Sequence, residues 1–217
     1  MKKTIKSVLV LFMGATLMVS GFISCNKDNE PMELETQQDN VVDDSKILSD
    51  ENFLAMKTAI DNVNNAIAQS LQQQNVSFEE FKTLYRQQNE SRFANIFDDN
   101  SAFINKNMEA IKINYEALVA KYPELLTCVG CDYNLANSPD QVISSLNTLN
   151  GDGFASLAQR SGTFSCGWQY YVCIAAVGLP AAACVIGSAG SGLVSGLCVA
   201  GFGAGALLCL DSYCTRV

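Results

Sequence analysis

Histidine is absent from the 217 residues of the chain. This absence excludes the Ser–His and Cys–His nucleophile pairs of many enzymes and every metal site that depends on imidazole. Basic residues are also scarce, with 14 Lys and Arg against 22 Asp and Glu, so the formal net charge is −8. Such an acidic chain is a poor ligand for phosphate backbones. We therefore expect no enzymatic activity, no metal, no cofactor and no nucleic-acid partner.

The C-terminal part of the chain lacks charge altogether between Arg160 and Asp211. Two long apolar runs occur there, Trp168–Gly187 and Leu193–Leu210, and the small residues of Ser188–Gly192 separate them as a turn signal. At about 1.5 Å per residue, each run is long enough or nearly so to cross a bilayer if it is helical. The pattern predicts a helical hairpin.

The N-terminus has the pattern of an export signal. Three lysines within the first six residues precede an apolar stretch over residues 8–23, which Ser24 and Cys25 follow. The segment Phe22–Cys25 resembles the lipobox of bacterial lipoproteins. The resemblance implies that residues 1–24 are a signal peptide and that Cys25 carries a lipid anchor. The alternative is an uncleaved N-terminal anchor helix.

Removal of that signal would take away three lysines and bring the net charge from −8 to −11. Residues 25–48 are polar, acidic and poor in aromatics, which predicts a disordered tether. The start of this segment, Cys25-Asn26-Lys27-Asp28, resembles the export tags of surface lipoproteins in some Gram-negative bacteria. That likeness implies a lipid-anchored protein on the outer membrane or cell surface of such a bacterium.

Residues 49–160 predict an α-helical bundle. A first helix has an apolar stripe and can be capped by Ser49 or Asp50, a second opens with a capping box at Ser77, and a third covers 101–121. No strand pattern competes. The core side chains expected here, with those of a fourth helix from Pro139, are Phe53, Met56, Ile60, Val63, Ile67, Leu71, Phe81, Leu84, Tyr85, Ile104, Met108, Ile111, Tyr115, Leu118, Val119, Val142, Leu146 and Leu149.

Eight cysteines follow Cys25, and an even number in an exported protein indicates disulfides. The last six are arranged symmetrically about Ser191: the two inner pairs are each equidistant from it, and the outer pair is offset by two positions. This symmetry predicts three nested disulfides that staple residues 161–217 into an antiparallel αα-hairpin, although eight cysteines allow about 105 connectivities. The predicted bonds are Cys166–Cys214, Cys173–Cys209 and Cys184–Cys198.

Disulfides between helices require close packing. Their Cα atoms lie about 4.4–6.8 Å apart, whereas helix axes are ordinarily about 8–10 Å apart. Small residues on the facing surfaces permit this approach. A unit of this size has little core of its own, and each bridge adds about 2–4 kcal/mol. The candidate facing residues are Ala175, Ala176, Ala183, Ala200 and Gly201.

The remaining pair, Cys128 and Cys131, forms a CxxC motif. One interpretation is a redox site. No βαβ pattern surrounds it, however, and this favours a structural disulfide. A zinc site with two further cysteines is an alternative that the oxidising location disfavours.

The region from Cys166 to Cys214 resembles the cysteine-rich domain of halocin-type bacteriocins. In that family a compact, oxidised, Gly- and Ala-rich peptide forms the C-terminal part of a longer precursor and acts against competing cells at their membrane. The resemblance implies a membrane-active domain whose partners are a lipid bilayer and an immunity or export protein.

Physical reasoning leaves two locations open for the apolar faces of the hairpin. They are covered by the bundle, or they face lipid, where helices satisfy their own backbone. The leading hypothesis is a membrane-active toxin domain carried and masked by the bundle, with a release site at Arg160–Thr163. The alternatives are a non-enzymatic interaction lipoprotein in which the hairpin is structural, and a thiol oxidoreductase that uses Cys128 and Cys131.

Overall fold

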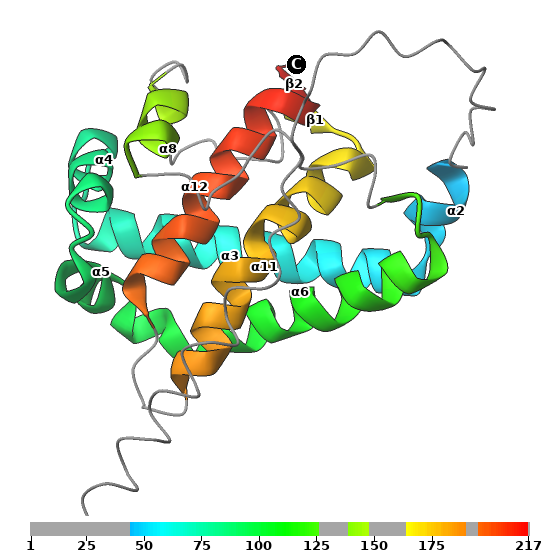
Figure 1. The fold of residues 1–217 in the computed structure, drawn as a ribbon, viewed down its shortest axis with the longest axis horizontal. Coiled ribbons are helices and arrows are strands. Elements are labelled where there is room, and N and C mark those ends of the chain that lie inside the picture. Colours follow the sequence, from blue (N-terminus) through cyan, green and yellow to red (C-terminus); the bar gives the residue numbers. More distant parts are fainter. Residues whose placement is uncertain (1–43, 126–138, 148–163, 190–194, 217) are drawn as a thin grey trace, which may run out of the picture. The chain divides into compact units, whose positions relative to one another are not determined.

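The computed structural model describes residues 44–125, 139–147, 164–189 and 195–216. The described part of the chain is built from helices, with one pair of short strands, so the predicted all-α class is confirmed. Figure 1 shows these elements. They are α2 (Asp44–Ser49), α3 (Glu51–Gln73), α4 (Phe78–Arg86), α5 (Glu90–Phe97), the 3₁₀ turn η1 (Asp98–Asn100), α6 (Ser101–Lys121), α8 (Pro139–Leu146), β1 (Phe164–Cys166), α11 (Trp168–Ala189), α12 (Gly196–Tyr213) and β2 (Cys214–Arg216).

Helices α3 and α6 form the long antiparallel pair of the bundle. The pairing follows from side-chain contacts along their length: Lys121 binds Asp50 at one end, and Asn100 Nδ2 donates to Ser70 Oγ over 2.8 Å at the other. Both helices carry the predicted apolar stripe, and every expected core residue of α3 is buried. In the other helices the prediction holds too, except that Tyr85 and Val119 are only half-buried, and Leu149 lies outside the described residues.

The predicted helix starts are confirmed. Asp50 caps α3 by accepting the backbone N–H of Asn52 at 2.9 Å, and Ser77 caps α4 by accepting that of Glu80 at 3.1 Å. Helix α5 has no counterpart in the sequence prediction. It has only eight residues, too few for a helical period to be conclusive, and it follows Gln88, whose φ of 50° places it in the left-handed region.

The predicted hairpin is confirmed as helices α11 and α12, which lie side by side in Figure 1. Pro180 lies inside α11, where its ring removes one backbone donor. One short pair of strands lies at the open end of the hairpin, a feature that the sequence did not predict. There β1 and β2 pair antiparallel with Cys166 opposite Cys214. Strands of three residues are too short for alternation to reveal them in a sequence.

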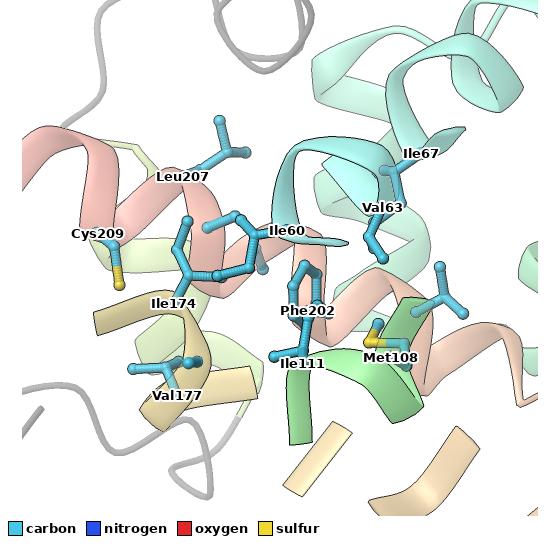
Figure 2. Packing of buried hydrophobic residues seen from close by; sticks show 14 of the residues in the cluster. Ile60, Val63, Ile67, Met108, Ile111, Ile174, Val177, Phe202, Leu207 and Cys209 are labelled. Atoms are coloured by element: carbon cyan, nitrogen blue, oxygen red, sulfur yellow. The ribbon is translucent and has the colours of Figure 1, made fainter. Parts of the chain in front are cut away.

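One hydrophobic cluster includes residues of both the bundle and the hairpin. Figure 2 shows Phe202 of α12 among Ile60 and Val63 of α3 and Met108 and Ile111 of α6. The described residues of the bundle and the hairpin accordingly belong to one compact unit, whereas separate domains, 49–160 and 161–217, were expected. The hairpin alone has too little volume to bury its apolar surface, so the bundle provides the cover.

The prediction of a disordered tether over 25–48 is wrong at its C-terminal end. Residues 44–48 belong to α2, and Ile47 is fully buried. The acidic composition of this segment does not reveal the helix. One buried apolar side chain, that of Ile47, is enough to hold so short a helix against the core. The rest of the predicted tether and the predicted signal, 1–24, lie outside the described residues.

The buried Asp50 couples folding to pH. Burial by itself raises the pKa of its carboxyl, but hydrogen bonds and charge from Lys121, together with the backbone N–H groups of Asn52 and Phe53, hold that pKa below its ordinary value. The Tyr122 hydroxyl also donates to the same carboxylate, over 3.3 Å. A carboxyl whose pKa is lowered by folding stabilises the protein above its unfolded pKa of about 3.9 and loses that contribution as pH falls further.

We therefore expect Asp50→Asn to lower the free energy of unfolding at pH 7 by about 1–3 kcal/mol, because the charged hydrogen bond to Lys121 is lost while an Asn can still cap. Urea unfolding at pH 7 and at pH 3 measures this. The difference between wild type and variant should shrink at the lower pH. Asp99→Asn, on the exposed η1 turn, is the control; an unchanged difference at both pH values would contradict the linkage.

Candidate functional site

The three predicted disulfides of the hairpin are all formed. Their Cα–Cα distances are 4.4 Å for Cys166–Cys214, 5.9 Å for Cys173–Cys209 and 6.0 Å for Cys184–Cys198. The two bonds nearest the turn join α11 to α12 directly. The third joins the paired strands, where opposite Cα atoms in an antiparallel ladder already lie about 4.5 Å apart. This pairing explains the offset of two positions in the symmetry about Ser191.

Small residues allow the two helices to approach. Ala175 and Ala200 are fully buried. Gly178 matters most, because a Cβ built on it would lie 2.6 Å from the ring of Phe202. The expectation that Ala183 faces the partner helix is wrong, since its side chain is exposed. The others, Ala176 and Gly201, are half-buried.

The hairpin packs on the bundle through equally close contacts. A Cβ on Gly196 would lie 2.3 Å from the backbone nitrogen of Ala94 in α5, so this position admits only Gly. A Cβ on Gly203 would lie 3.4 Å from Cγ2 of Ile67 in α3.

One helix of the described residues, over Trp168–Val185, is long and apolar enough to cross a membrane, and 61% of that window is buried within the fold.

Glu90 of α5 caps the N-terminus of α12. Its Oε1 accepts the backbone N–H of Gly196 at 2.7 Å, and its Oε2 accepts that of Leu197 at 3.2 Å and the Ser195 hydroxyl at 3.1 Å. A carboxylate is favourable here because the first N–H groups of a helix lack intrahelical partners and the helix dipole is positive at this end. Glu90 was not predicted as a cap, because no local sequence pattern connects residues 106 positions apart.

The opposite end of the hairpin is held by polar and aromatic contacts. Trp168 Nε1 donates to Asp44 Oδ1 of α2 over 2.8 Å. Tyr171 packs edge-on against Phe53 with ring centroids 5.9 Å apart, and the Lys57 ammonium lies 4.9 Å from the Tyr171 ring centre. Burial lowers the pKa of Lys57, but Asp61 and Tyr171 outweigh it and the pKa is raised, so this cation stays charged.

The hairpin is thus cross-linked to itself by disulfides, whereas its described side-chain contacts with the bundle are non-covalent. Within the part of the chain that the structure describes, no disulfide joins the two, and no group of three or more Cys, Asp or Glu side chains is arranged to hold a metal ion. Several predicted sites lie outside the described residues. These are the lipid-anchor position Cys25, the CxxC pair Cys128 and Cys131, and the release site 160–163.

Asn64 differs from the other buried polar residues of the core in its hydrogen bonding. Its side chain is fully buried in α3, and neither its Oδ1 nor its Nδ2 has a hydrogen-bond partner among the described residues. An unsatisfied buried amide costs about 1–3 kcal/mol. Asn107 of α6, which is also buried, shows the satisfied arrangement, since its Nδ2 donates to the Phe103 carbonyl over 2.8 Å and its Oδ1 accepts from Asn62 at 3.0 Å.

Comparison with protein-family models, curated proteins and solved structures finds no match to the chain.

Because Asn64 lacks hydrogen-bond partners within the described part of the chain and Asn107 has them, substitution of each by Leu should change the free energy of unfolding in opposite directions. Asn64→Leu keeps the branched shape and removes an unsatisfied amide, so the free energy of unfolding should rise by about 1–2 kcal/mol. Asn107→Leu should lower it by a similar amount, because Asn62 loses its partner. Chemical denaturation of both variants measures the difference. Equal destabilisation by the two would show that the Asn64 amide is satisfied.

Glu90→Ala should lower the free energy of unfolding by about 1–2 kcal/mol, because two backbone N–H groups of α12 lose their acceptor. Hydrogen exchange should accelerate at Gly196 and Leu197. Glu109→Ala, at an exposed position of α6, is the matched control and should stay within about 0.5 kcal/mol of wild type. Unchanged exchange at both amides in the Glu90 variant would be incompatible with the cap.

Proposed function

We propose that this chain is an exported, lipid-anchored precursor that carries a membrane-active, bacteriocin-like hairpin in masked form. The observation that carries the proposal is the bonding pattern of α11 and α12. Three disulfides hold the two apolar helices to each other, whereas, apart from the polypeptide chain itself, the contacts of the described residues that hold them to the bundle are non-covalent. The hairpin can therefore leave the bundle as one intact unit.

The chemistry of that unit suits a bilayer. No charged residue occurs between Arg160 and Asp211, so insertion incurs none of the roughly 2.5–3.5 kcal/mol that a central Arg, Lys or Asp costs. Helices satisfy their own backbone hydrogen bonds in lipid. The disulfides keep α11 and α12 together after the hairpin leaves the apolar side chains of the bundle.

The bundle is the mask in this proposal. In the docked state the faces that would meet lipid contact α3, α5 and α6 instead, and this keeps the uncharged helices compatible with water. The resemblance of Cys166–Cys214 to halocin-type bacteriocins supports the same function. The lipid on Cys25, the location at the outer membrane or cell surface and a partner that confers immunity or export belong to the proposal on the sequence grounds already given.

The second candidate function is a non-enzymatic interaction lipoprotein. The burial of 61% of the Trp168–Val185 window favours it, because a permanently buried hairpin is simply the core of the fold. In that case the disulfides stabilise a surface that binds another protein. The two candidates differ in one respect: only the first requires the hairpin to separate from the bundle.

A covalent lock between bundle and hairpin distinguishes the two candidate functions. Ile67→Cys/Gly203→Cys should form a disulfide between α3 and α12, because a Cβ on Gly203 lies 3.4 Å from Cγ2 of Ile67. We expect the purified full chain to release dye from vesicles of phosphatidylethanolamine and phosphatidylglycerol, and the locked variant to release several-fold less. Peptide mapping verifies the new disulfide. Glu90→Ala should speed the release of dye, because it removes a contact between bundle and hairpin.

The single variants Ile67→Cys and Gly203→Cys are the matched controls and should behave like the unlocked chain. Equal release by locked and unlocked chains would show that undocking is not required. Absence of release from every variant, Glu90→Ala included, would favour the interaction lipoprotein over the membrane-active precursor.

A further inference from the structure

The polar-tipped aromatic residues of the hairpin are concentrated at one end. Every Trp and Tyr of α11 lies in its first four residues, as Trp168, Tyr170 and Tyr171, and the single Tyr of α12 is its last residue, Tyr213. Because the helices are antiparallel, all four belong to the same end, which we call the base. Side chains of this kind prefer the headgroup level of a bilayer, with the ring in the apolar layer and the N–H or O–H in water.

Charge has the same asymmetry. At the base, Asp211 lies in the last turn of α12 and Arg216 ends β2. The opposite end, which we call the turn end, consists of the C-terminus of α11 with Gly187 and the N-terminus of α12 with Gly196. Its carboxylate contact, Glu90, belongs to the bundle and stays behind when the hairpin leaves. The end without charges of its own is the end that can cross hydrocarbon.

The lengths of the helices fit a crossing. From Trp168 to Gly187, α11 spans 19 helical steps, or about 29 Å at 1.5 Å per residue, against a hydrocarbon thickness of about 30 Å. The apolar part of α12, Gly196–Leu210, is shorter, at about 21 Å. A modest local thinning or tilt accommodates such a mismatch. The disulfides prevent either helix from crossing without the other.

We propose that the hairpin enters a lipid bilayer turn end first, as a stapled pair, and stops when the aromatic base reaches the headgroups of the entry leaflet. This inference rests on the proposed membrane activity and adds its direction and depth. It also assigns a role to the contacts that the base makes with the bundle in the docked state. In the docked state Asp44 accepts the Trp168 N–H and the Lys57 ammonium lies over the Tyr171 ring, so bundle residues make the polar contacts that headgroups would make in the bilayer.

The sole Trp of the chain makes the orientation measurable. In the wild-type full chain, fluorescence reports on the base through Trp168. In Trp168→Phe/Gly187→Trp it reports on the turn end, and a Cβ at Gly187 meets no heavy atom within 4 Å, so the new ring has room in the docked fold. Thermal unfolding of the double variant checks that the fold is retained. Vesicles carry nitroxide-labelled headgroups in the outer leaflet only or in both leaflets.

After external addition, we expect the outer-leaflet label to quench Trp168 strongly and the Trp at 187 several-fold less. Labelling of both leaflets should quench the two Trp residues comparably. Strong quenching of both by the outer label would mean that the hairpin lies flat on the surface. The reverse pattern would mean entry by the base. Either result overturns the inference while dye release still supports membrane activity, whereas no quenching together with no release removes the membrane activity itself.

Discussion

The structure depends on one constraint: two helices without a single charge between Trp168 and Leu210 must be kept from water. Their mutual interface cannot achieve this, because each helix turns only one face to the other, with Gly178 close against the ring of Phe202. Apolar faces remain on the outside of the pair. The bundle covers them with α6 and α3 on α11 and with α5 and α3 on α12, while α3 and α6 also pack on each other.

This arrangement divides the stabilising interactions into two kinds. Within the hairpin they are covalent, over sequence separations of 48, 36 and 14 residues. Between hairpin and bundle they are apolar packing with polar contacts at the two ends, Glu90 at the turn end and Asp44 at the base. Covalent bonds persist in any solvent, whereas apolar packing depends on water. The cross-links within the hairpin therefore persist in any surroundings, whereas its association with the bundle depends on water.

Features that produce a local periodicity or a symmetry in the sequence were predicted well. The stripe of α3, the caps at Asp50 and Ser77 and the pairing of six cysteines all have such signals, and all three are confirmed. Contacts between distant segments have none, so Glu90 on Gly196 and Asp44 on Trp168 were missed. Ala183 was misplaced because composition alone does not fix which face of an Ala-rich helix is turned inward. The lipid on Cys25 and the role of Cys128 and Cys131 stay predictions.

The nesting of the disulfides has a consequence for how the chain acquires them. Each bond encloses the next, so none of the three requires the chain to thread a ring that another has already closed. Oxidation can begin at the Cys184–Cys198 pair, whose sequence separation of 14 gives the smallest loop-closure entropy, and proceed outward, each step shortening the search for the next. The order of oxidation then has no bearing on the final topology, and a thiol oxidant without isomerase activity is sufficient for maturation once the helices have paired.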